Sequence, residues 1–119
     1  MPATARPPKP TIPYTALVGQ VLLRHRGRLG LQQSELAEAL NASQPAYSRI
    51  EQGDTTLSIS QLRAIAHRLG MRPGEILREA DSLADQLRAQ GVDVTGEKGV
   101  NPAAIMIGLG ILAALLASK

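Results

Sequence analysis

Residues 33–53 read QSELAEALNASQPAYSRIEQG, and this stretch decides the fold that the sequence predicts. Apolar residues recur at helical spacing over residues 33–40, which predicts a short amphipathic helix there. Asn41 follows, and asparagine tolerates the left-handed backbone that a tight helix-ending turn needs. Ser43 is placed to cap a second helix, with Pro45 in its first turn, where the missing N–H costs little. The stretch is therefore expected to form two short helices joined by a tight turn.

The second of these helices has an apolar face and a polar face. Tyr47 and Ile50 are spaced to point inward, whereas Gln44, Ser48 and Arg49 point outward. Two short helices and a turn, with a polar outer face on the second helix, form a helix-turn-helix motif. The target expected for such a motif is the major groove of DNA.

Residues 31–37 and 43–53 closely resemble the phage-repressor (Cro-like, or XRE) helix-turn-helix family. The resemblance extends over about residues 17–77, roughly half of the chain. It implies an all-α fold in which residues 14–78 form a five-helix lambda-repressor-like bundle. It also implies sequence-specific binding to double-stranded DNA and a role in transcriptional regulation, such as that of a repressor.

The chain departs from the family pattern at three places. Asn41 stands at the usual turn glycine, Tyr47 occupies a core position that is usually β-branched, and residues 54–56 read Asp-Thr-Thr where the family is often basic. The last departure, together with the apolar tail at residues 101–119, favours an alternative function, a membrane-tethered helix-turn-helix module that binds another protein. Gln44 and Arg49 are retained at the contact positions of the motif, and this favours DNA binding.

The resemblance assigns roles to individual residues. In the family, the first residues of the second helix reach base edges, and the start of the preceding helix binds phosphates. By position, base contacts are expected from Gln44, Pro45, Ser48 and Arg49, and phosphate contacts from Gln33 and Ser43. Glutamine can bind adenine N6 and N7, and arginine can bind guanine O6 and N7. The alternative is that these side chains are only a solvated helix face.

The family also implies a partly buried ion pair between the first and third helices of the bundle. Arg26 and Glu51 occupy the two positions here. We expect the pair to hold the two helices together, so that loss of one partner costs roughly 3–5 kcal/mol if the site is buried.

The composition excludes several classes of protein. The 119 residues include two tyrosines but no Phe, Trp or Cys, so the core must be aliphatic and neither a disulfide nor a thiolate site exists. His25 and His67 are the only histidines, and they lack metal-ligand spacing. The chain shows no catalytic triad order and no Gly-rich phosphate loop, so we predict no catalytic residue, no metal and no cofactor. An enzyme is not expected.

Charge is unevenly distributed along the chain. The net charge is +3, and residues 1–72 carry nine Lys or Arg against four Asp or Glu. Residues 73–119 carry four against six. The basic part contains the helix-turn-helix motif, as a surface that faces phosphates requires.

The segment before the motif is expected to change at Tyr14 from a proline-rich arm to a helix. Residues 1–13 hold five of the eight prolines and are predicted to be a disordered arm, or alternatively a basic arm that follows DNA. They lack the apolar region of a secretory signal. Residues 14–29 are predicted to form the first helix.

Ser58-Ile59-Ser60-Gln61 has the form of a capping box and predicts a fourth helix that ends before Gly70. The side chains expected to point inward from it are Ile59, Leu62, Ile65, Ala66 and Leu69.

Pro73 is placed to begin a fifth helix, followed by an amphipathic extension over residues 79–90. The apolar residues that recur there at heptad-like spacing are Ile76, Ala80, Leu83 and Leu87. This row either packs back on the bundle or joins two copies. We favour a homodimer, because single helix-turn-helix modules usually bind DNA in pairs.

The C-terminal part is predicted to be a linker and an apolar helix. Residues 91–100 are glycine-rich, and Asn101-Pro102 is a suitable start for a tail helix over residues 101–119. No polar side chain occurs between residues 103 and 117. A helix of this length is short of the ~30 Å hydrocarbon core. The alternatives are a membrane-associated tail and a helix buried in an oligomer, so the chain is expected in the cytoplasm, either free or anchored to the inner membrane.

Overall fold

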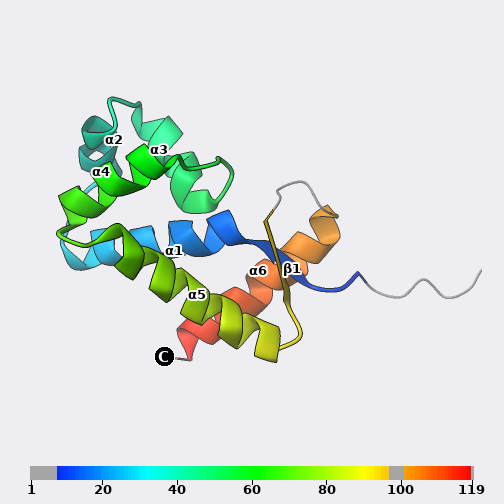
Figure 1. The fold of residues 1–119 in the computed structure, drawn as a ribbon. Helices are drawn as coiled ribbons and strands as arrows, with labels where there is room; N and C mark the ends of the chain where they lie inside the picture. The colour runs from blue at the N-terminus through cyan, green and yellow to red at the C-terminus, as the bar shows by residue number, and fades with distance from the viewer. Residues whose placement is uncertain (1–7, 97–100, 119) are drawn as a thin grey trace, which may run out of the picture.

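The structure is a computed structural model that describes residues 8–96 and 101–118. The chain is mostly helical, with a small parallel sheet (Figure 1). Its elements are, in order, β1 (Thr11–Pro13), α1 (Tyr14–Arg28), α2 (Gln33–Ala39), α3 (Gln44–Gln52), α4 (Ile59–Leu69), α5 (Pro73–Ala89), β2 (Asp93–Thr95) and α6 (Pro102–Ala117).

α1 is the central helix of the bundle and packs against both α3 and α5. The core is aliphatic apart from Tyr47, as the composition requires. Its fully buried members from the bundle helices include Leu17, Val21, Leu22, Leu36, Tyr47, Ile65, Ile76, Leu83 and Leu87.

The predicted helix signals are present in the structure. Ser43 caps α3 by accepting a hydrogen bond from the Ala46 N–H at 3.2 Å, and Asn41 takes the left-handed backbone with φ 52°. Ser58 and Gln61 form the predicted capping box of α4, each accepting a hydrogen bond from the other's backbone N–H. The ends of these helices could therefore be predicted from local sequence.

Ile59 was expected to point inward, and this prediction is wrong. Ile59 is the first residue of α4 and is 86% exposed. Helical side chains lean toward the N-terminus of their helix, so the first side chain extends past the helix end and does not lie over a preceding turn. The other predicted inward residues of α4 are buried.

The predicted disorder of residues 1–13 is wrong at Thr11–Pro13, and the predicted linker at residues 91–100 is wrong at Asp93–Thr95. Thr11–Pro13 forms the buried strand β1, which pairs in parallel with β2 in the register Ile12 to Val94. The Asp93 N–H also donates to the Pro10 carbonyl at 2.8 Å. Proline is tolerated at Pro13 because a strand end need not supply a ladder donor. Residues 1–7 and 97–100 lie outside the described residues.

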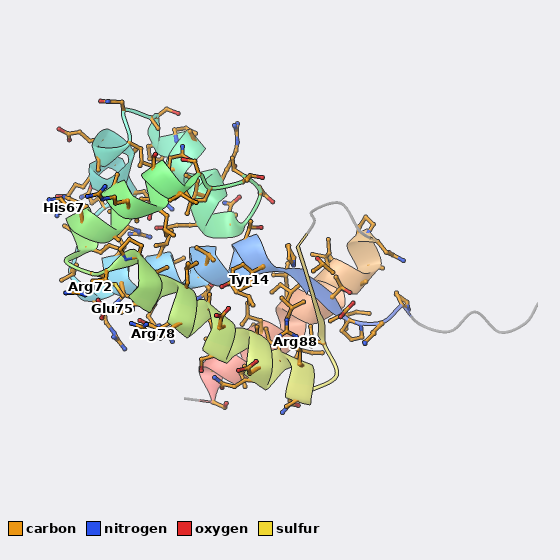
Figure 2. The ribbon with its side chains drawn as sticks, in the orientation of Figure 1. Tyr14, His67, Arg72, Glu75, Arg78 and Arg88 are labelled. Atoms are coloured by element: carbon orange, nitrogen blue, oxygen red, sulfur yellow. The ribbon has the colours of Figure 1, made fainter. Side chains whose placement is uncertain are left out.

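α5 is one continuous helix, so the domain boundary expected at residue 78 falls inside it. The apolar row predicted for α5 is buried within this chain, at 0–1% exposure for Ile76, Ala80, Leu83 and Leu87. The row therefore packs back on the bundle and does not face a second copy. Tyr14, labelled in Figure 2, lies at the start of α1. Its hydroxyl donates to the Asp81 carboxylate of α5 at 2.7 Å. Burial and this carboxylate raise the pKa of Tyr14 to about 12.

α6 packs on β1, and Figure 1 shows it well away from α2 and α3. Asn101 caps it by accepting a hydrogen bond from the Ala103 N–H at 2.9 Å. Gly108 lies directly on the Thr11 backbone, where an added Cβ would collide with the Thr11 carbonyl. Within residues 8–96 and 101–118, none of the helices has the length and hydropathy that crossing a membrane requires.

Candidate nucleic-acid interface

The helix that carries the candidate base contacts is seated closely on α1. Gly19 of α1 faces the backbone carbonyl of Glu51, and Gly53 faces the backbone of Ala16. A Cβ at either glycine would collide with backbone atoms. Gly53 also ends α3 in the left-handed conformation, with φ 77°, and its carbonyl accepts a hydrogen bond from Thr15 Oγ1 at 2.9 Å. These contacts fix the position of α3 on the bundle.

Arg26 and Glu51, expected to pair on the basis of the resemblance, form a bidentate ion pair between α1 and α3. Arg26 Nε and Nη2 donate to Glu51 Oε2 and Oε1 at 2.7 and 3.1 Å, and Nη1 donates to the Leu31 carbonyl at 2.9 Å. The Glu51 side chain is 1% exposed and that of Arg26 is 19% exposed. The hydrogen bond to Glu51 is the main cause of the raised pKa of Arg26. The pair is thus a buried structural clamp behind the outer face of α3.

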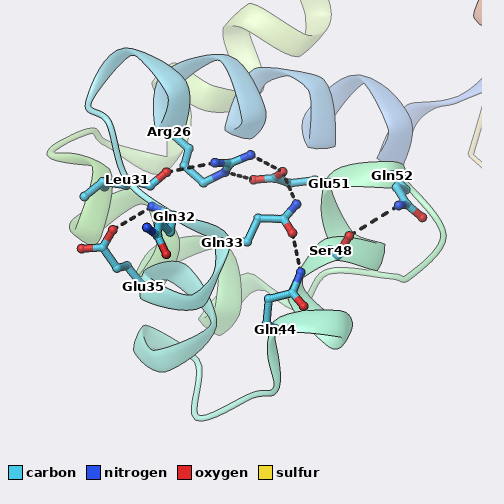
Figure 3. A network of polar contacts seen from close by, with 9 residues as sticks. All are labelled: Arg26, Leu31, Gln32, Gln33, Glu35, Gln44, Ser48, Glu51 and Gln52. Atoms are coloured by element: carbon cyan, nitrogen blue, oxygen red, sulfur yellow. Dashed lines mark hydrogen bonds and ion pairs between the residues drawn. The ribbon is translucent and has the colours of Figure 1, made fainter.

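Two glutamines extend this clamp to the surface (Figure 3). Gln33 Nε2, at the start of α2, donates to Glu51 Oε1 at 2.8 Å. Gln44 Nε2, at the start of α3, donates to Gln33 Oε1 at 2.6 Å. A continuous series of hydrogen bonds therefore runs from the buried ion pair to an exposed residue on α3.

The remaining candidate contact residues lie on the outer side of α3 or at its cap. Gln44, Pro45 and Arg49 are exposed, and Ser48 is half-buried. Gln52 Nε2 donates to Ser48 Oγ at 3.4 Å. Ser43 is exposed at the cap of α3, while Gln33 is half-buried at the start of α2. The structure thus brings Gln33 and Gln44 together at the adjoining N-terminal ends of α2 and α3, with Ser43 and Pro45 beside Gln44 in the chain. Ser48 and Arg49 lie further along α3, with Arg49 in its last turn.

The inner side of α3 is held by the core. Tyr47 and Ile50 are buried, and burial raises the pKa of the Tyr47 phenol. Among the described residues, no hydrogen bond of the Tyr47 hydroxyl meets standard distance and angle limits, but the nearby Glu51 carboxylate also raises the pKa of the phenol. One face of α3 is therefore buried in the core, and the opposite face is exposed and mainly polar.

Part of the basic cluster at the end of α1 is directed away from this surface. Arg24 Nη2 and His25 Nε2 contact the Glu79 carboxylate of α5 at 3.0 and 2.8 Å. Burial alone would raise the pKa of Glu79, but the hydrogen bonds and electrostatic interactions with His25 and Arg24 together lower it. These two side chains join α1 to α5 and are not candidates for binding phosphate.

Sequence reasoning did not find the contact between Gln33 and Gln44, or that between Gln33 and Glu51. The sequence signal was present, since Gln33 and Gln44 were each placed at the start of a helix of the motif. What was missing was the packing angle of α2 on α3, which depends on the whole bundle. Among the described residues, no group of His, Cys, Asp or Glu could hold a metal ion.

Comparisons with known proteins agree with this geometry. A helix-turn-helix family model matches residues 22–76. Two solved structures of the clp gene regulator ClgR from Corynebacterium glutamicum are each 30% identical to the chain. The first match covers 65% of this chain and 82% of that one, with a TM-score of 0.62, and the second covers 58% and 90%, with a TM-score of 0.55. Among curated proteins, no relative matches. The chain therefore belongs to the Cro-like (XRE) helix-turn-helix family.

Proposed function

We propose that the chain is a DNA-binding transcriptional regulator that reads base sequence in the major groove with α3. One observation carries the proposal. The outer face of α3 exposes Gln44, Pro45 and Arg49, while Tyr47 and Ile50 fix its inner face in the core. A short helix that is held rigidly on one side and is polar on the other can enter a groove without rearrangement. The resemblance to ClgR, a gene regulator in its own organism, supports the same function.

Each exposed residue has a chemical role in this proposal. Gln44 would bind adenine, Arg49 would bind guanine or a nearby phosphate, and Pro45 would contact a thymine methyl group. Ser43 Oγ accepts a hydrogen bond from the Ala46 N–H, and its hydroxyl proton is available to a phosphate oxygen. Gln33 has a second N–H beyond the one that binds Glu51, and this N–H would reach a phosphate.

The proposal includes a homodimer on two half-sites. A single recognition helix offers few base contacts, and proteins with this motif usually obtain specificity by binding in pairs. Because the apolar row of α5 is buried within the chain, the two copies would have to meet through another surface. Sedimentation of the full chain with and without a selected duplex measures the number of copies bound. As a regulator of bacterial genes, the protein would act in the cytoplasm.

A protein-binding module is the second candidate function. It is favoured by the outer face of α6, which exposes the apolar side chains of Met106, Ile107 and Leu109. Such a module would not show the steep loss of affinity with salt that release of counterions from DNA produces.

The test is a titration of a labelled duplex, selected from random DNA, at several salt concentrations. We expect affinity to fall steeply as salt rises. Arg49→Ala should cost about 1–3 kcal/mol on the selected duplex and relax the preference at one base, whereas Gln33→Ala should weaken binding to all sequences. Arg78→Ala is the matched control, because it removes the same charge from an exposed position on α5 (Figure 2). Equal losses on selected and random DNA for Arg49→Ala would refute its assignment to a base.

A further inference from the structure

A cavity lies against the inner side of α3, near the end of that helix. Its volume is about 150 Å³, and its lining comes from α1, α3, α4, α5 and the loop between α3 and α4. Its buried lining residues include Val18, Ile50 and Leu62. Its exposed lining residues are Thr55, Thr56 and Leu77. The cavity therefore has an apolar floor in the core and opens to solvent beside the loop between α3 and α4.

The cavity offers no charged group to a ligand. Among the described residues that line it, none is Lys, Arg, His, Asp or Glu. Tyr14 also lines it, and burial together with the Asp81 carboxylate raises the pKa of this phenol to about 12, so it is neutral at pH 7. An ion in the cavity would lose its hydration without gaining a partner of opposite charge. The ligand that fits is therefore uncharged.

Two of the hydroxyl groups in the lining are already used within the chain. The Tyr14 hydroxyl donates to the Asp81 carboxylate at 2.7 Å, and Thr15 Oγ1 donates to the Gly53 carbonyl at 2.9 Å. A hydroxyl has one proton to donate, so neither group has a donor left for a ligand. A buried water molecule needs about two to four polar partners, which the apolar floor does not supply. An apolar molecule therefore fits the floor better than water does.

We propose that this cavity is a binding site for a small uncharged apolar molecule, about the size of one aromatic ring, and that the bound molecule stabilises the end of α3. The size follows from the volume, because apolar cavities of about 150 Å³ accept benzene or xenon. A molecule that fills such a space gives the lining side chains dispersion contacts that they lack while it is empty. The inference goes beyond the proposed function and holds whether or not the chain binds DNA.

The effect on α3 follows from the position of the cavity. Ile50 lies near the end of α3, and Thr55 follows the left-handed turn at Gly53 that ends the helix. The N–H groups of Gly53 and Asp54 close this turn by donating to the carbonyls of Ile50 and Arg49 at 3.0 and 2.9 Å. A ligand in contact with both Ile50 and Thr55 would be lost when the turn opens. Its binding therefore opposes that opening.

The experiment is an NMR titration of the free full chain with benzene. We expect saturable shifts of the signals from Val18, Ile50, Leu62 and Thr55, with a Kd of about 1 mM, which six non-hydrogen atoms can supply. At a benzene concentration of ten times Kd, the melting temperature should rise by about 3–6 °C. Benzoate has the same ring with a negative charge, and at pH 7 it should bind at least about tenfold more weakly.

Two variants locate the bound molecule. Val18→Phe places a ring in the cavity itself and should weaken benzene binding by at least about tenfold. Val94→Phe is the matched control, because it adds the same ring at a half-buried position of β2 outside the cavity, and it should leave the Kd within about twofold. Thermal unfolding establishes that each variant is folded. If Val18→Phe is not, Val18→Leu replaces it, with an expected loss of about threefold.

Three results would overturn the site. The first is the absence of saturable shifts, and the second is shifts centred on the exposed apolar side chains of α6 at Met106, Ile107 and Leu109. The third is benzene binding that Val18→Phe leaves unchanged. Equal binding of benzoate and benzene would overturn the uncharged, apolar class of ligand.

Amide hydrogen exchange in the same samples tests the effect on α3. Saturating benzene should slow exchange of the Gly53 and Asp54 amides by several-fold, because opening of their turn releases the ligand. Gly70 is the internal control, since it ends α4 in the same left-handed conformation and does not line the cavity. Its amide exchange should change less than that of Gly53. If benzene slows the two glycine amides equally, it stabilises only the fold as a whole, and the specific effect on the end of α3 is overturned.

Discussion

The α1–α3 interface and the α6–β1 interface both depend on glycines that let two backbones approach closely, but the two interfaces differ in their other contacts. At the first, Gly19 and Gly53 bring two backbones together beside a buried ion pair and several directed hydrogen bonds. At the second, Gly108 lies on the Thr11 backbone, and α6 contributes apolar side chains. The first interface is specified by polar partners as well as by shape, and the second depends mainly on shape and apolar contact.

This difference is a reason to place the candidate site beside the first interface. Directed bonds hold a side chain in one orientation, which reading a base requires, whereas apolar burial fixes position but no donor or acceptor. Loss of a polar partner should therefore be costly at α1–α3. Disruption of α6 should leave the outer face of α3 intact.

The largest effect is expected at the buried ion pair. Arg26→Met should lower the free energy of unfolding by about 3–5 kcal/mol, because it leaves the Glu51 carboxylate buried without its partner. Denaturant unfolding measures this change. Arg68→Met is the matched control, since the Arg68–Glu35 pair is at the surface, with both side chains 41% exposed. Its cost should be below about 1 kcal/mol.

The second-largest effect tests close backbone packing at the same interface, with no change of charge. Gly19→Ala should cost about 3 kcal/mol, because the new Cβ meets the backbone carbonyl of Glu51, which cannot move without α3. Gly27→Ala lies on the same helix with open space around it and should be neutral or stabilising by up to about 1 kcal/mol. Similar melting temperatures for the two variants would contradict the close seating of α3 on α1.

The corresponding change at the second interface should be smaller and should not affect DNA binding. Gly108→Ala places a Cβ against the Thr11 carbonyl and should displace α6 from β1 at a cost of about 1–3 kcal/mol. Faster amide exchange at residues 11–13, with unchanged affinity for DNA, is the expected result. Gly110→Ala, in open space on the same helix, is the control. A loss of DNA affinity specific to Gly108→Ala would show that the two interfaces are coupled.

A smaller, pH-dependent effect is expected where α1 meets α5. Arg24 and His25 lower the pKa of Glu79 in the folded chain, so the carboxylate stabilises the fold above its ordinary pKa near 4.5. This contribution is lost as the pH falls through the lowered folded value. Glu79→Gln should therefore cost about 1 kcal/mol or less at pH 7 and almost nothing near pH 3. Unfolding curves between pH 7 and pH 3 test this, and a constant difference across that range would contradict it.

The smallest effect is expected inside the core. Tyr47→Phe removes a buried hydroxyl that lies near the Glu51 carboxylate but makes no hydrogen bond of standard geometry among the described residues, so stability should be unchanged or rise by up to about 1 kcal/mol. Thermal unfolding of the two chains is the measurement. A clear loss of stability would mean that the Tyr47 hydroxyl makes a bond that holds α3 in place.

The helix-turn-helix part of the fold could be predicted because its signals are local. Ser43, Ser58 and Asn41 specify helix ends through their own side chains or backbone preference, and the structure has them in those roles. The strand at Thr11–Pro13 could not be predicted in this way, since its partner Asp93–Thr95 lies far along the chain and a proline-rich segment carries no strand pattern. The apolar run of α6 likewise gives no indication of the surface that covers it.

The resemblance named residues for the candidate site but not the hydrogen bonds that connect them. The resemblance placed Gln33, Gln44, Arg26 and Glu51 in separate roles. The structure joins them in one hydrogen-bonded series, because α2 packs on α3 at an angle that only the assembled bundle defines. The resemblance could therefore assign a role to each group, but it gave no indication of the order in which the groups are connected.

Selection of binding sites from a random DNA pool tests the central claim most directly, which is that the outer face of α3 reads bases. The wild-type chain and the control Arg78→Ala should enrich the same motif. A chain that carries both Gln44→Ala and Arg49→Ala should enrich none while remaining folded. If the wild-type chain enriches no motif, or if the doubly substituted chain enriches the same one, the claim is contradicted.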